Sequence, residues 1–419
     1  MDTIHLTLPY GDTLLPLTLP EENFGELLQP PAVQAVSFRE GLGQALDHPL
    51  ETTGLEEFLR DGRSLILVIN DETRPTPTGR VLESLYPMIS ARLKKVLVAT
   101  GTHGKGSEDG MGRILGEFWP RLRPITVFHD CRREREMVYL GETSRGTPVR
   151  INQEVMMADR ILVVGSVEPH YFSGYTGGRK AVVPGLAAYS TIVANHSLAM
   201  DPLAGPLRLA GNPVHEDLEE ALGLLTVPPV FSIMLVLTPR RDLYAAFAGS
   251  LRQTLLRAAE KADEVYTVPF RQKGDVVIAV VFPPLDRDLY QSQKPIEHAK
   301  MALKEDGIII LLMACPQGAG NEEFQRLMLE TGDPEKVRHL LYGPYRLGHH
   351  RLIRNVRFLQ QGGRVFGVTQ LDPAFLSRTF IRPMAGLQEA LDTALEIKGK
   401  KALVHVLMDA GHFIPKFRP

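Results

Sequence analysis

The segment RILVVGSVEPHYFSGYTGGRKAVVPG (residues 160–185) joins an apolar run to a long loop. The run at 161–164 is continuous and rich in β-branched side chains, which is typical of a strand buried on both faces. The segment carries one histidine, one lysine and five glycines, all of them after the run. Because ligands of open α/β sheets bind beyond the carboxyl ends of the strands, this segment predicts both a fold and the place of a site.

Apolar runs of the same kind recur along the chain, at 64–70, 94–100, 124–129, 231–238, 275–281, 307–314, 363–370 and 401–411. Helix-like stretches lie between several of them, at 79–93, 214–225 and 250–266. In a chain of 419 residues, this alternation predicts an α/β fold with two α/β domains and mostly parallel sheets.

The polar stretch YTVPFRQKGD (266–275) separates a helix-like stretch from a new series of strands, so we place a domain boundary there. We expect an N-terminal α/β domain over residues 1–270 and a C-terminal α/β domain over residues 275–401. We also expect the last strand, within 402–419, to return to the N-terminal domain, because a chain end often closes back on an early sheet.

Composition excludes several classes of function. The chain has 47 basic and 49 acidic residues and a net charge of −2, which argues against nucleic acid or an anionic membrane as the main partner. No apolar run approaches the roughly 18 residues that would span a bilayer, and the N-terminus has no signal-peptide pattern. The two cysteines, Cys131 and Cys315, lie at no metal-binding spacing, so we expect reduced thiols in a cytoplasmic protein.

Polar residues follow the predicted strands. In NDETRPTPT (70–78), Asp71 and Arg74 are three residues apart, and an arginine fork can hold a carboxylate or phosphate. A local Asp–Arg pair at a helix start explains this spacing equally well. In ATGTHGKGS (99–107), His103 lies among glycines at a strand end, where it can act as a general base. An exposed loop histidine explains that pattern too, and the spacing does not match a phosphate-binding P-loop.

The loop after residue 166 is the strongest candidate. His170 is a second possible base, and Gly177 and Gly178 can present backbone N–H groups to a phosphate. Lys180 can bind phosphate, or become a nucleophile if its pKa is lowered. A solvated glycine-rich turn beside an ordinary surface lysine is the alternative. His196, near the end of a helix-like stretch at 186–197, can complement the helix dipole or bind a metal.

The stretch PPLDRDLYQSQKP (283–295) places Gln291 and Lys294 three residues apart, on one face if it is helical. The pair offers an amide and a cation to a carboxylate, or is the polar first turn of a surface helix. The sequence has no motif of zinc proteases, serine hydrolases or Rossmann dinucleotide-binding proteins. The residues alone therefore predict a crevice with two histidines, a lysine and an arginine, and they name no reaction.

Five segments together resemble the signature segments of the nickel-dependent lactate racemase family, the LarA-like proteins. They occur in the family's order and at similar spacings, within residues 5 to 410: NDETRP (70–75), ATGTH (99–103), EPHYFSGYTGGRKAVVPG (168–185), ANHS (194–197) and PLDRDLYQSQK (284–294). The family fold implies two α/β domains with an active-site cleft between them. Its cofactor is a nickel-pincer nucleotide, a pyridinium mononucleotide whose two sulfur-bearing arms hold nickel, and residues 1–270 would be the cofactor-binding domain.

The resemblance implies a role for each matching residue of the cofactor site. Lys180 would be attached covalently to one arm of the cofactor, and His196 would be the protein ligand to nickel. Asp71 would contact the cofactor, as would Tyr290. Gly177 belongs to the same cofactor-binding loop, together with its neighbour at 178.

The resemblance also implies the reaction. His103 and His170 would be acid/base residues on opposite faces of the substrate, while Arg74, Gln291 and Lys294 would bind its carboxylate. The enzyme would invert Cα of a 2-hydroxy acid by reversible hydride transfer to the cofactor, through a transient 2-keto acid. This route avoids a carbanion, and the cofactor carries the difficult step.

The substrate stays open between lactate, malate and another 2-hydroxy acid. A dicarboxylate would need a second cation, which Lys105 or Arg287 could supply. We expect the small-molecule substrate and the cofactor-maturation proteins to be the partners. Two other functions compete with this one: a metalloenzyme without the pincer cofactor, such as a zinc lyase or hydrolase, and a non-catalytic binder of nucleotides or carboxylates.

Overall fold

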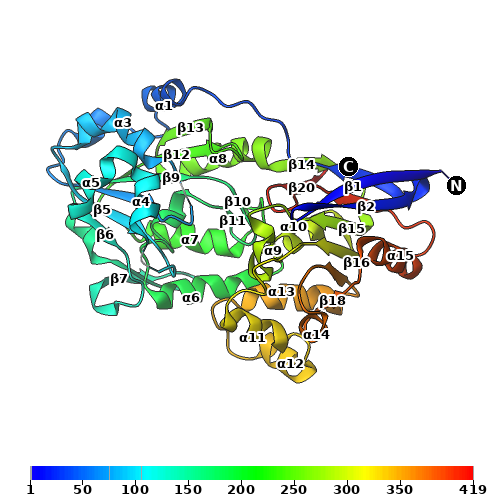
Figure 1. Cartoon of the computed structure of the whole chain (residues 1–419). Helices are drawn as coiled ribbons and strands as arrows, with labels where there is room; N and C mark the ends of the chain where they lie inside the picture. The colour runs from blue at the N-terminus through cyan, green and yellow to red at the C-terminus, as the bar shows by residue number, and fades with distance from the viewer. Residues whose placement is uncertain (1, 75, 105, 419) are drawn as a thin grey trace. The chain divides into compact units, whose positions relative to one another are not determined.

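The computed structural model describes residues 2–74, 76–104 and 106–418. The chain divides into two compact units. Figure 1 colours the chain by residue number, from blue at the N-terminus to red at the C-terminus. We call Ala32–Val265 the central unit, and Met1–Pro31 together with Tyr266–Pro419 the terminal unit. Both combine helices with mostly parallel sheets, which confirms the predicted α/β class.

The central unit contains a six-stranded sheet. From edge to edge its strands are β13 (Leu243–Gly249), β12 (Val230–Leu237), β9 (Arg160–Ser166), β4 (Leu65–Asn70), β5 (Leu93–Ala99) and β6 (Thr126–Phe128). Neighbouring strands are parallel except β13, which runs antiparallel to β12. Consecutive residues of β4, such as Leu67 and Val68, are fully buried although they point to opposite faces. The strands are therefore covered on both sides, as their continuous apolar runs predict.

Helices and short hairpins surround this sheet. The first four helices pack their apolar side chains against β4, β5, β9 and β12 in one core. The helices are α1 (Phe38–Asp47), α2 (Leu55–Leu59), α3 (Thr78–Ile89), α4 (Glu108–Leu115), α5 (Trp119–Leu122), α6 (Tyr189–Ser197), α7 (Pro213–Gly223) and α8 (Leu251–Tyr266). The antiparallel pairs are β7 (Met137–Glu142) with β8 (Pro148–Asn152), and β10 (Pro169–His170) with β11 (Gly174–Tyr175).

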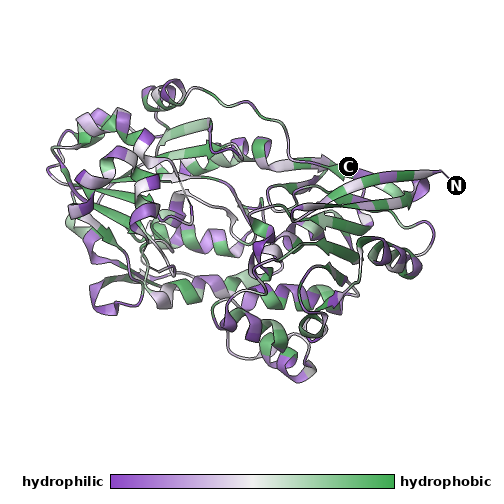
Figure 2. Cartoon of the chain, in the orientation of Figure 1, coloured by the Kyte–Doolittle hydropathy of each residue, from purple (hydrophilic) through white to green (hydrophobic). Residues whose placement is uncertain are grey.

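The terminal unit has its own six-stranded sheet, and all its strands are parallel. In order they are β18 (Ile381–Pro383), β17 (Arg364–Val368), β16 (Leu303–Leu312), β15 (Gly274–Val280), β19 (Val404–Leu407) and β3 (Phe24–Leu28). The two-stranded sheets are β1 (Thr3–Tyr10) with β2 (Thr13–Pro20), and β14 (Thr267–Phe270) with β20 (Ile414–Phe417). In Figure 2 the strands are mostly apolar, whereas the helices carry both apolar and polar residues.

The helices of the terminal unit are α9 (Leu289–Ser292), α10 (Pro295–Met301), α11 (Glu322–Glu330), α12 (Pro334–Tyr342), α13 (His349–Gln360), α14 (Pro373–Leu376) and α15 (Leu387–Lys398). Leu8, Leu17 and Leu19 of the first hairpin share a core with α15 and the sheet. Short 3-10 helices complete the chain: η1 (Glu21–Asn23), η2 (Gly116–Phe118), η3 (Arg123–Ile125), η4 (Glu134–Glu136), η5 (Gln153–Met157), η6 (Gly178–Ala181), η7 (Leu198–Met200) and η8 (Leu285–Arg287).

The observed division of the chain differs from the expected one at both ends. Residues 1–31 were expected in the domain 1–270, but they belong to the terminal unit because β3 pairs with β19. Residues 402–419 were expected to return to that same domain. They stay with 275–401, because β19 pairs with β15 and β20 pairs with β14. A short apolar run predicts a strand and does not identify the strand to which it will bond.

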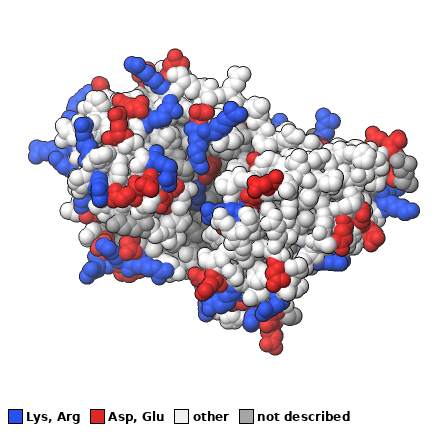
Figure 3. Space-filling model, in the orientation of Figure 1, with Lys and Arg blue, Asp and Glu red and all other residues white. Residues whose placement is uncertain are grey.

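The surface carries charges of both signs. On the face drawn in Figure 3, lysines and arginines are interspersed with aspartates and glutamates, in keeping with the near-zero net charge. No helix within the described ranges combines the length and apolar character that a bilayer crossing requires.

Candidate active site

Three neighbouring parallel strands of the central unit bring the predicted site residues to one edge of the sheet. Strands β9, β4 and β5 lie side by side, and each is followed by a loop with polar side chains. Asp71 follows β4, His103 follows β5, and Glu168 and His170 follow β9. Since these strands run in one direction, their carboxyl ends meet. The expected convergence is confirmed for the loops of this unit.

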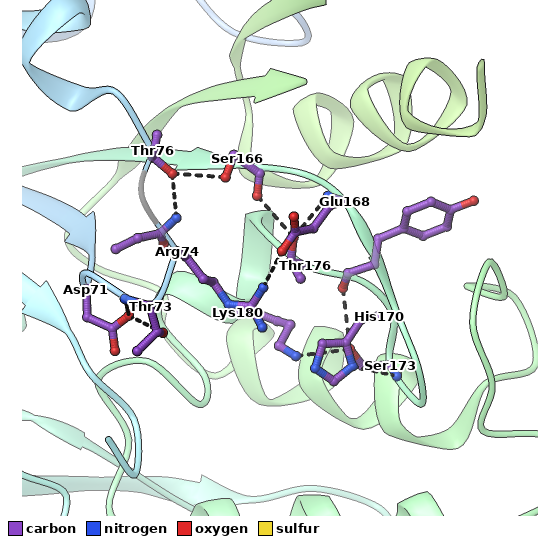
Figure 4. Close-up of polar contacts among 12 residues, drawn as sticks. Asp71, Thr73, Arg74, Thr76, Ser166, Glu168, His170, Ser173, Thr176 and Lys180 are labelled. Carbon is purple, nitrogen blue, oxygen red and sulfur yellow. Dashed lines mark hydrogen bonds and ion pairs between the residues drawn. The ribbon is translucent and has the colours of Figure 1, made fainter. Parts of the chain in front are cut away.

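Hydrogen bonds fix the loop after β4 to the end of β9 (Figure 4). The side-chain amide of Asn70 donates to the hydroxyl of Thr76 over 2.8 Å, and that hydroxyl lies 2.9 Å from the Ser166 hydroxyl. The backbone N–H of Glu168 donates to the Thr176 hydroxyl, 3.0 Å away. The two loops are therefore joined to each other, which limits the movement of the side chains between them.

The Asp71 carboxylate holds His103. Asp71 Oδ2 lies 2.6 Å from His103 Nδ1, while Oδ1 accepts hydrogen bonds from the hydroxyl and N–H of Thr73. Burial raises the pKa of Asp71, but the hydrogen bonds from His103 and Thr73 outweigh burial and lower it overall. The carboxylate is therefore ionised at neutral pH and accepts the Nδ1 proton. This leaves the lone pair of the neutral His103 on Nε2, the atom that can act as a base.

Arg74 is paired with Glu168. Arg74 Nη1 lies 2.7 Å from Glu168 Oε1, and both side chains are partly exposed. The contact joins the loop after β4 to the loop after β9 and holds one arm of the guanidinium. The alternative of a local Asp71–Arg74 side-chain pair is not observed, since Asp71 bonds to His103 and Thr73 instead.

His170 lies in the short strand β10, paired opposite Gly174 of β11. Its Nδ1 accepts the N–H of Ser173 over 3.3 Å, so in the neutral ring the proton is on Nε2. Burial, and then the cationic groups around it, lower the pKa of His170 well below its ordinary value. The two histidines thus differ in the resting state, because Nε2 is a proton acceptor in His103 and a proton donor in His170.

Lys180 lies in η6, and its side chain is partly buried. Nζ donates to the Ser173 hydroxyl over 3.1 Å and lies 5.5 Å from the centre of the Phe172 ring. Burial, and then the charges of Arg74 and Arg179, lower the pKa of Lys180 well below its ordinary value. A larger fraction of this amine is uncharged near neutral pH than in an exposed lysine, which makes it a nucleophile.

Phe172 brings three predicted site residues together. Its ring centre lies 4.5 Å from that of His170 and 5.1 Å from that of His196, and the Lys180 amine lies against the same ring. The amine and the His196 imidazole therefore both lie beside one aromatic ring. Sequence reasoning missed Phe172, since no sequence pattern indicates that an aromatic residue within a loop will pack against site residues from several segments.

Arg179 is a second residue that the sequence did not reveal. Its side chain is fully buried, donates to the carbonyls of Ser173 and Tyr175, and faces Glu219 at 3.8 Å. Arg179 thus stabilises, from the protein interior, the loop that carries His170 and Lys180. A solvated turn with an ordinary surface lysine does not describe this loop.

The paired glycines allow close packing of the loop on the protein around it. A Cβ on Gly177 would come within 2.7 Å of Val167, and one on Gly178 within 2.8 Å of Leu255. Both have positive φ, +73° and +54°. Gly178 was expected to offer its N–H to a phosphate, but this group donates to the sulfur of Met234 over 3.2 Å. The glycines let the loop pack closely on the protein beneath it.

Three further predicted residues belong to the terminal unit. Tyr290 and Gln291 lie in α9, and Lys294 immediately precedes α10. The Lys294 amine donates to the Gln291 side-chain oxygen and lies 5.8 Å from the centre of the Tyr290 ring, so these three form one cluster. A shared cleft between the two units remains a prediction. Of the two candidate second cations, Arg287 donates to Asp288 over 3.0 Å, and Lys105 lies outside the described residues.

His196 lies in the last turn of α6, which begins at Tyr189 rather than at residue 186 as expected. Its imidazole nitrogen suits nickel as a ligand. Within the described part of the chain, no three His, Cys, Asp or Glu side chains form a group that could hold a metal ion. Catalytic zinc sites typically take three protein ligands. A metal group that brings other ligands of its own would need only one imidazole from the protein, which His196 could supply.

A buried carboxylate supports α6 next to His196. Asp217 of α7 is fully buried and accepts hydrogen bonds from Thr143, Thr147 and Asn195 at 2.6–2.9 Å. We expect Asp217→Ala to lower the free energy of unfolding by about 2–4 kcal/mol, because it leaves buried donors without an acceptor. Urea denaturation measures this. Glu260→Ala, which removes an exposed partner of Arg257, is the control, and equal midpoints for the two variants would contradict the prediction.

Comparison with known proteins covers nearly the whole chain. Residues 10–205 match the family model described as the lactate racemase N-terminal domain, and residues 271–414 match that of the lactate racemase C-terminal domain. The chain is 28% identical over 418 residues to a lactate racemase of Thermoanaerobacterium thermosaccharolyticum, covering 97% of each. It is also 28% identical over 425 residues to a lactate racemase of Lactiplantibacillus plantarum, covering 97% of this chain and 98% of that one.

A solved structure shows the same fold. The chain matches the lactate racemase apoprotein from Thermoanaerobacterium thermosaccharolyticum with a TM-score of 0.87 at 28% identity, over 99% of this chain and 100% of that one.

Proposed function

Because this chain belongs to the LarA family of lactate racemases, which are isomerases, we propose that it inverts Cα of a 2-hydroxy acid with the aid of a nickel-pincer nucleotide. The observation that carries the proposal is the arrangement around Phe172. The Lys180 amine and the imidazoles of His196 and His170 all lie against this one ring, and these are the groups proposed as nucleophile, metal ligand and acid/base. A hydrolase or a simple binder has no evident use for all three groups.

The residues of the central unit fit the cofactor. Lys180 would form a covalent thioamide bond with one arm, with loss of water, since its side chain is partly buried and its pKa is lowered. His196 would supply the protein ligand to nickel. Gly177, Gly178 and Arg179 would act indirectly, by holding the loop that carries Lys180. When bound, the nucleotide would supply an acceptor for the Cα hydrogen.

The two histidines would move protons at their Nε2 atoms. In one direction Nε2 of His103 accepts the substrate hydroxyl proton, and the Asp71 carboxylate stabilises the imidazolium that forms. In the other direction His170 must do the same, which first requires the neutral ring to move its proton from Nε2 to Nδ1 and to give up the hydrogen bond from the Ser173 N–H. Since two enantiomers have equal free energy, kcat/KM must be equal in both directions. An effect of the different resting states of the two histidines would therefore change kcat and KM by the same factor in one direction. The ratio kcat/KM would stay the same.

Arg74 would bind the substrate carboxylate. One of its arms donates to Glu168, which orients the planar guanidinium and leaves other donors of the fork for a ligand. We propose Gln291 and Lys294 of the terminal unit as further carboxylate ligands, with Tyr290 beside them. We also propose that cofactor-maturation proteins act on this chain.

The test is a panel of enantiopure 2-hydroxy acids incubated with protein that has been matured by cofactor-making enzymes. We expect loss of optical purity, together with a cofactor adduct in the intact mass. One zinc per chain without nucleotide absorbance would favour a zinc lyase or hydrolase. A bound nucleotide with no conversion of any substrate in the panel would favour a non-catalytic binder.

A further inference from the structure

Ser173 lies in the turn between the short strands β10 and β11, and its side chain is fully buried. Its hydroxyl accepts a hydrogen bond from Lys180 Nζ over 3.1 Å, and its backbone N–H donates to Nδ1 of His170 over 3.3 Å (Figure 4). One residue therefore contacts both the amine proposed to hold the cofactor and an imidazole proposed to move protons.

The hydroxyl of Ser173 is oriented as an acceptor towards the amine. Its Oγ donates to the backbone carbonyl of Tyr175 over 3.4 Å, while it accepts from Lys180. A hydroxyl has one proton and two lone pairs, so a proton directed to the carbonyl leaves the lone pairs for the amine. Ser173 thus engages an N–H of Lys180 and does not donate to the nitrogen lone pair, which is the pair that reacts.

Arg179 fixes the backbone on which this arrangement depends. Its guanidinium donates to the carbonyl of Ser173 over 2.8 Å and to that of Tyr175 over 3.3 Å, and its side chain is fully buried. A lysine side chain has a long, flexible stem, and its amine can take many positions unless a contact restricts it. A hydroxyl on a fixed turn supplies such a contact, so it restricts where the amine of Lys180 lies.

The same hydrogen bond suits the nitrogen before and after attachment. In thioamide formation, Lys180 Nζ bonds to the thiocarboxyl carbon of the cofactor arm, and the oxygen of that arm leaves as water. The water takes up one hydrogen of the uncharged amine and the proton of the thiocarboxylic acid. The second hydrogen of the amine stays on the nitrogen, and this N–H can still donate to the Ser173 hydroxyl.

We propose that Ser173 is a positioning residue for cofactor attachment: its hydroxyl holds the Lys180 amine with the lone pair available to the cofactor arm, and later holds the attached nitrogen. The proposal rests on the racemase function proposed above and deepens it. Ser173 acts through Lys180, and it is distinct from the groups proposed to touch the substrate.

The first measurement follows attachment over time by intact mass, in wild-type, Ser173→Ala and Ser190→Ala proteins incubated with cofactor-making enzymes. The Ser190 hydroxyl of α6 is also buried and has no hydrogen-bond partner among the described residues, so Ser190→Ala is the matched control. Ser173→Ala should gain the adduct about 2- to 10-fold more slowly, the range for the loss of one ordinary hydrogen bond. Ser190→Ala should gain it at the wild-type rate.

The second measurement separates positioning from a general disturbance of the loop. It follows carbamylation of Lys180 by cyanate as a function of pH, in protein without cofactor. The charged or titratable groups that act on this amine are unchanged in Ser173→Ala: Arg74, Glu168, His170 and Arg179. An acceptor stabilises an ammonium group more than an uncharged amine, so loss of the hydroxyl should lower the pKa of Lys180 further. A loop that opened to water would instead raise this pKa towards its ordinary value.

The outcomes distinguish this inference from the function itself. Adduct formation in Ser173→Ala at the rate of the Ser190→Ala control would overturn the inference. A raised pKa of Lys180 would also overturn it, because Ser173 would then only pack the loop. Both results leave the racemase function intact. A wild type that gains no adduct and converts no 2-hydroxy acid would overturn the function, while the cyanate measurement would still test the contact of Ser173 with Lys180.

Discussion

Replacing Lys180 by alanine is expected to abolish cofactor attachment and racemase activity together. The amine donates to Ser173, lies against Phe172, and has a pKa lowered by burial and by Arg74 and Arg179. No other lysine is needed for the proposed bond, so activity should fall to background. Intact mass of the co-expressed protein should show the adduct in the wild type and its absence in Lys180→Ala.

Matched variants make this result specific. Lys261→Ala removes an exposed lysine of α8 that pairs with Glu264, and should keep both adduct and activity. Lys180→Arg keeps a positive charge without a nucleophilic amine, so it should lose the adduct as well. A full adduct on Lys180→Ala would contradict the proposal, because the cofactor would then be attached elsewhere or not covalently.

The lowered pKa of Lys180 has its own pH dependence. An amine reacts when it is uncharged, so a lowered pKa extends its reactivity towards neutral pH, and reactivity is lost as the pH falls below that pKa. In the protein without cofactor, cyanate at pH 7 should therefore carbamylate Lys180 faster than the exposed Lys261. Peptide mass mapping after short exposures measures this, and a rate below that of Lys261 would contradict it.

Replacing His103 by glutamine is expected to lower kcat by about 10²- to 10⁴-fold, the usual contribution of a general base. Glutamine retains a polar side chain but cannot accept the hydroxyl proton at neutral pH. His103 is not proposed to hold the cofactor, so the adduct should remain complete by mass. Stopped assays with each enantiomer in turn measure kcat. A normal kcat with a complete adduct would show that another group is the base.

Asp71→Asn tests how His103 is positioned. The carboxylate at 2.6 Å holds the Nδ1 proton of His103, whereas a side-chain amide can donate to Nδ1 and move the proton to Nε2. A wrong tautomer of this kind can cost about as much as the loss of the base itself. We therefore expect a large fall in kcat with little change in KM. An unchanged kcat would return Asp71 to its expected role as a cofactor contact.

The pH profile distinguishes this positioning role from a structural one. The pKa of Asp71 is lowered overall, so its carboxylate stays ionised well into the acid range. Its support of His103 should be complete above that pKa and lost as the pH falls through it. The Asp71→Asn protein should lack this acid limb of the kcat profile while unfolding in urea at a midpoint close to that of the wild type.

Local sequence patterns predicted much of the fold. Continuous apolar runs such as 161–164 mark strands that are buried on both faces, and β9, β4, β5, β12, β15 and β16 follow them closely. In a parallel sheet, the residues directly after such strands meet at one edge. For this reason strand direction and position in the chain are enough to predict that Asp71, His103 and His170 lie at the same edge of the sheet.

Tertiary structure decided what those neighbours do. The role of Asp71 depends on which carboxylate oxygen faces His103, and Arg74 bonds to Glu168, ninety-four residues further along the chain. Phe172 and Arg179 are buried side chains that support the loop. The spacing of residues in the sequence does not reveal such contacts. The pairing of β3 with β19 and the contact of Arg351 with Tyr290 join residues that are far apart in the chain.

The sequence by itself determined the α/β class, the strands, and the chemical types present at their ends, because these depend on local periodicity and on strand direction. Only the tertiary structure decided the hydrogen-bond partners, the protonated nitrogen of each histidine and the environment of Lys180. Those properties change when the distance between two side chains changes by a few tenths of an ångström. They also depend on the exclusion of water by residues from many segments.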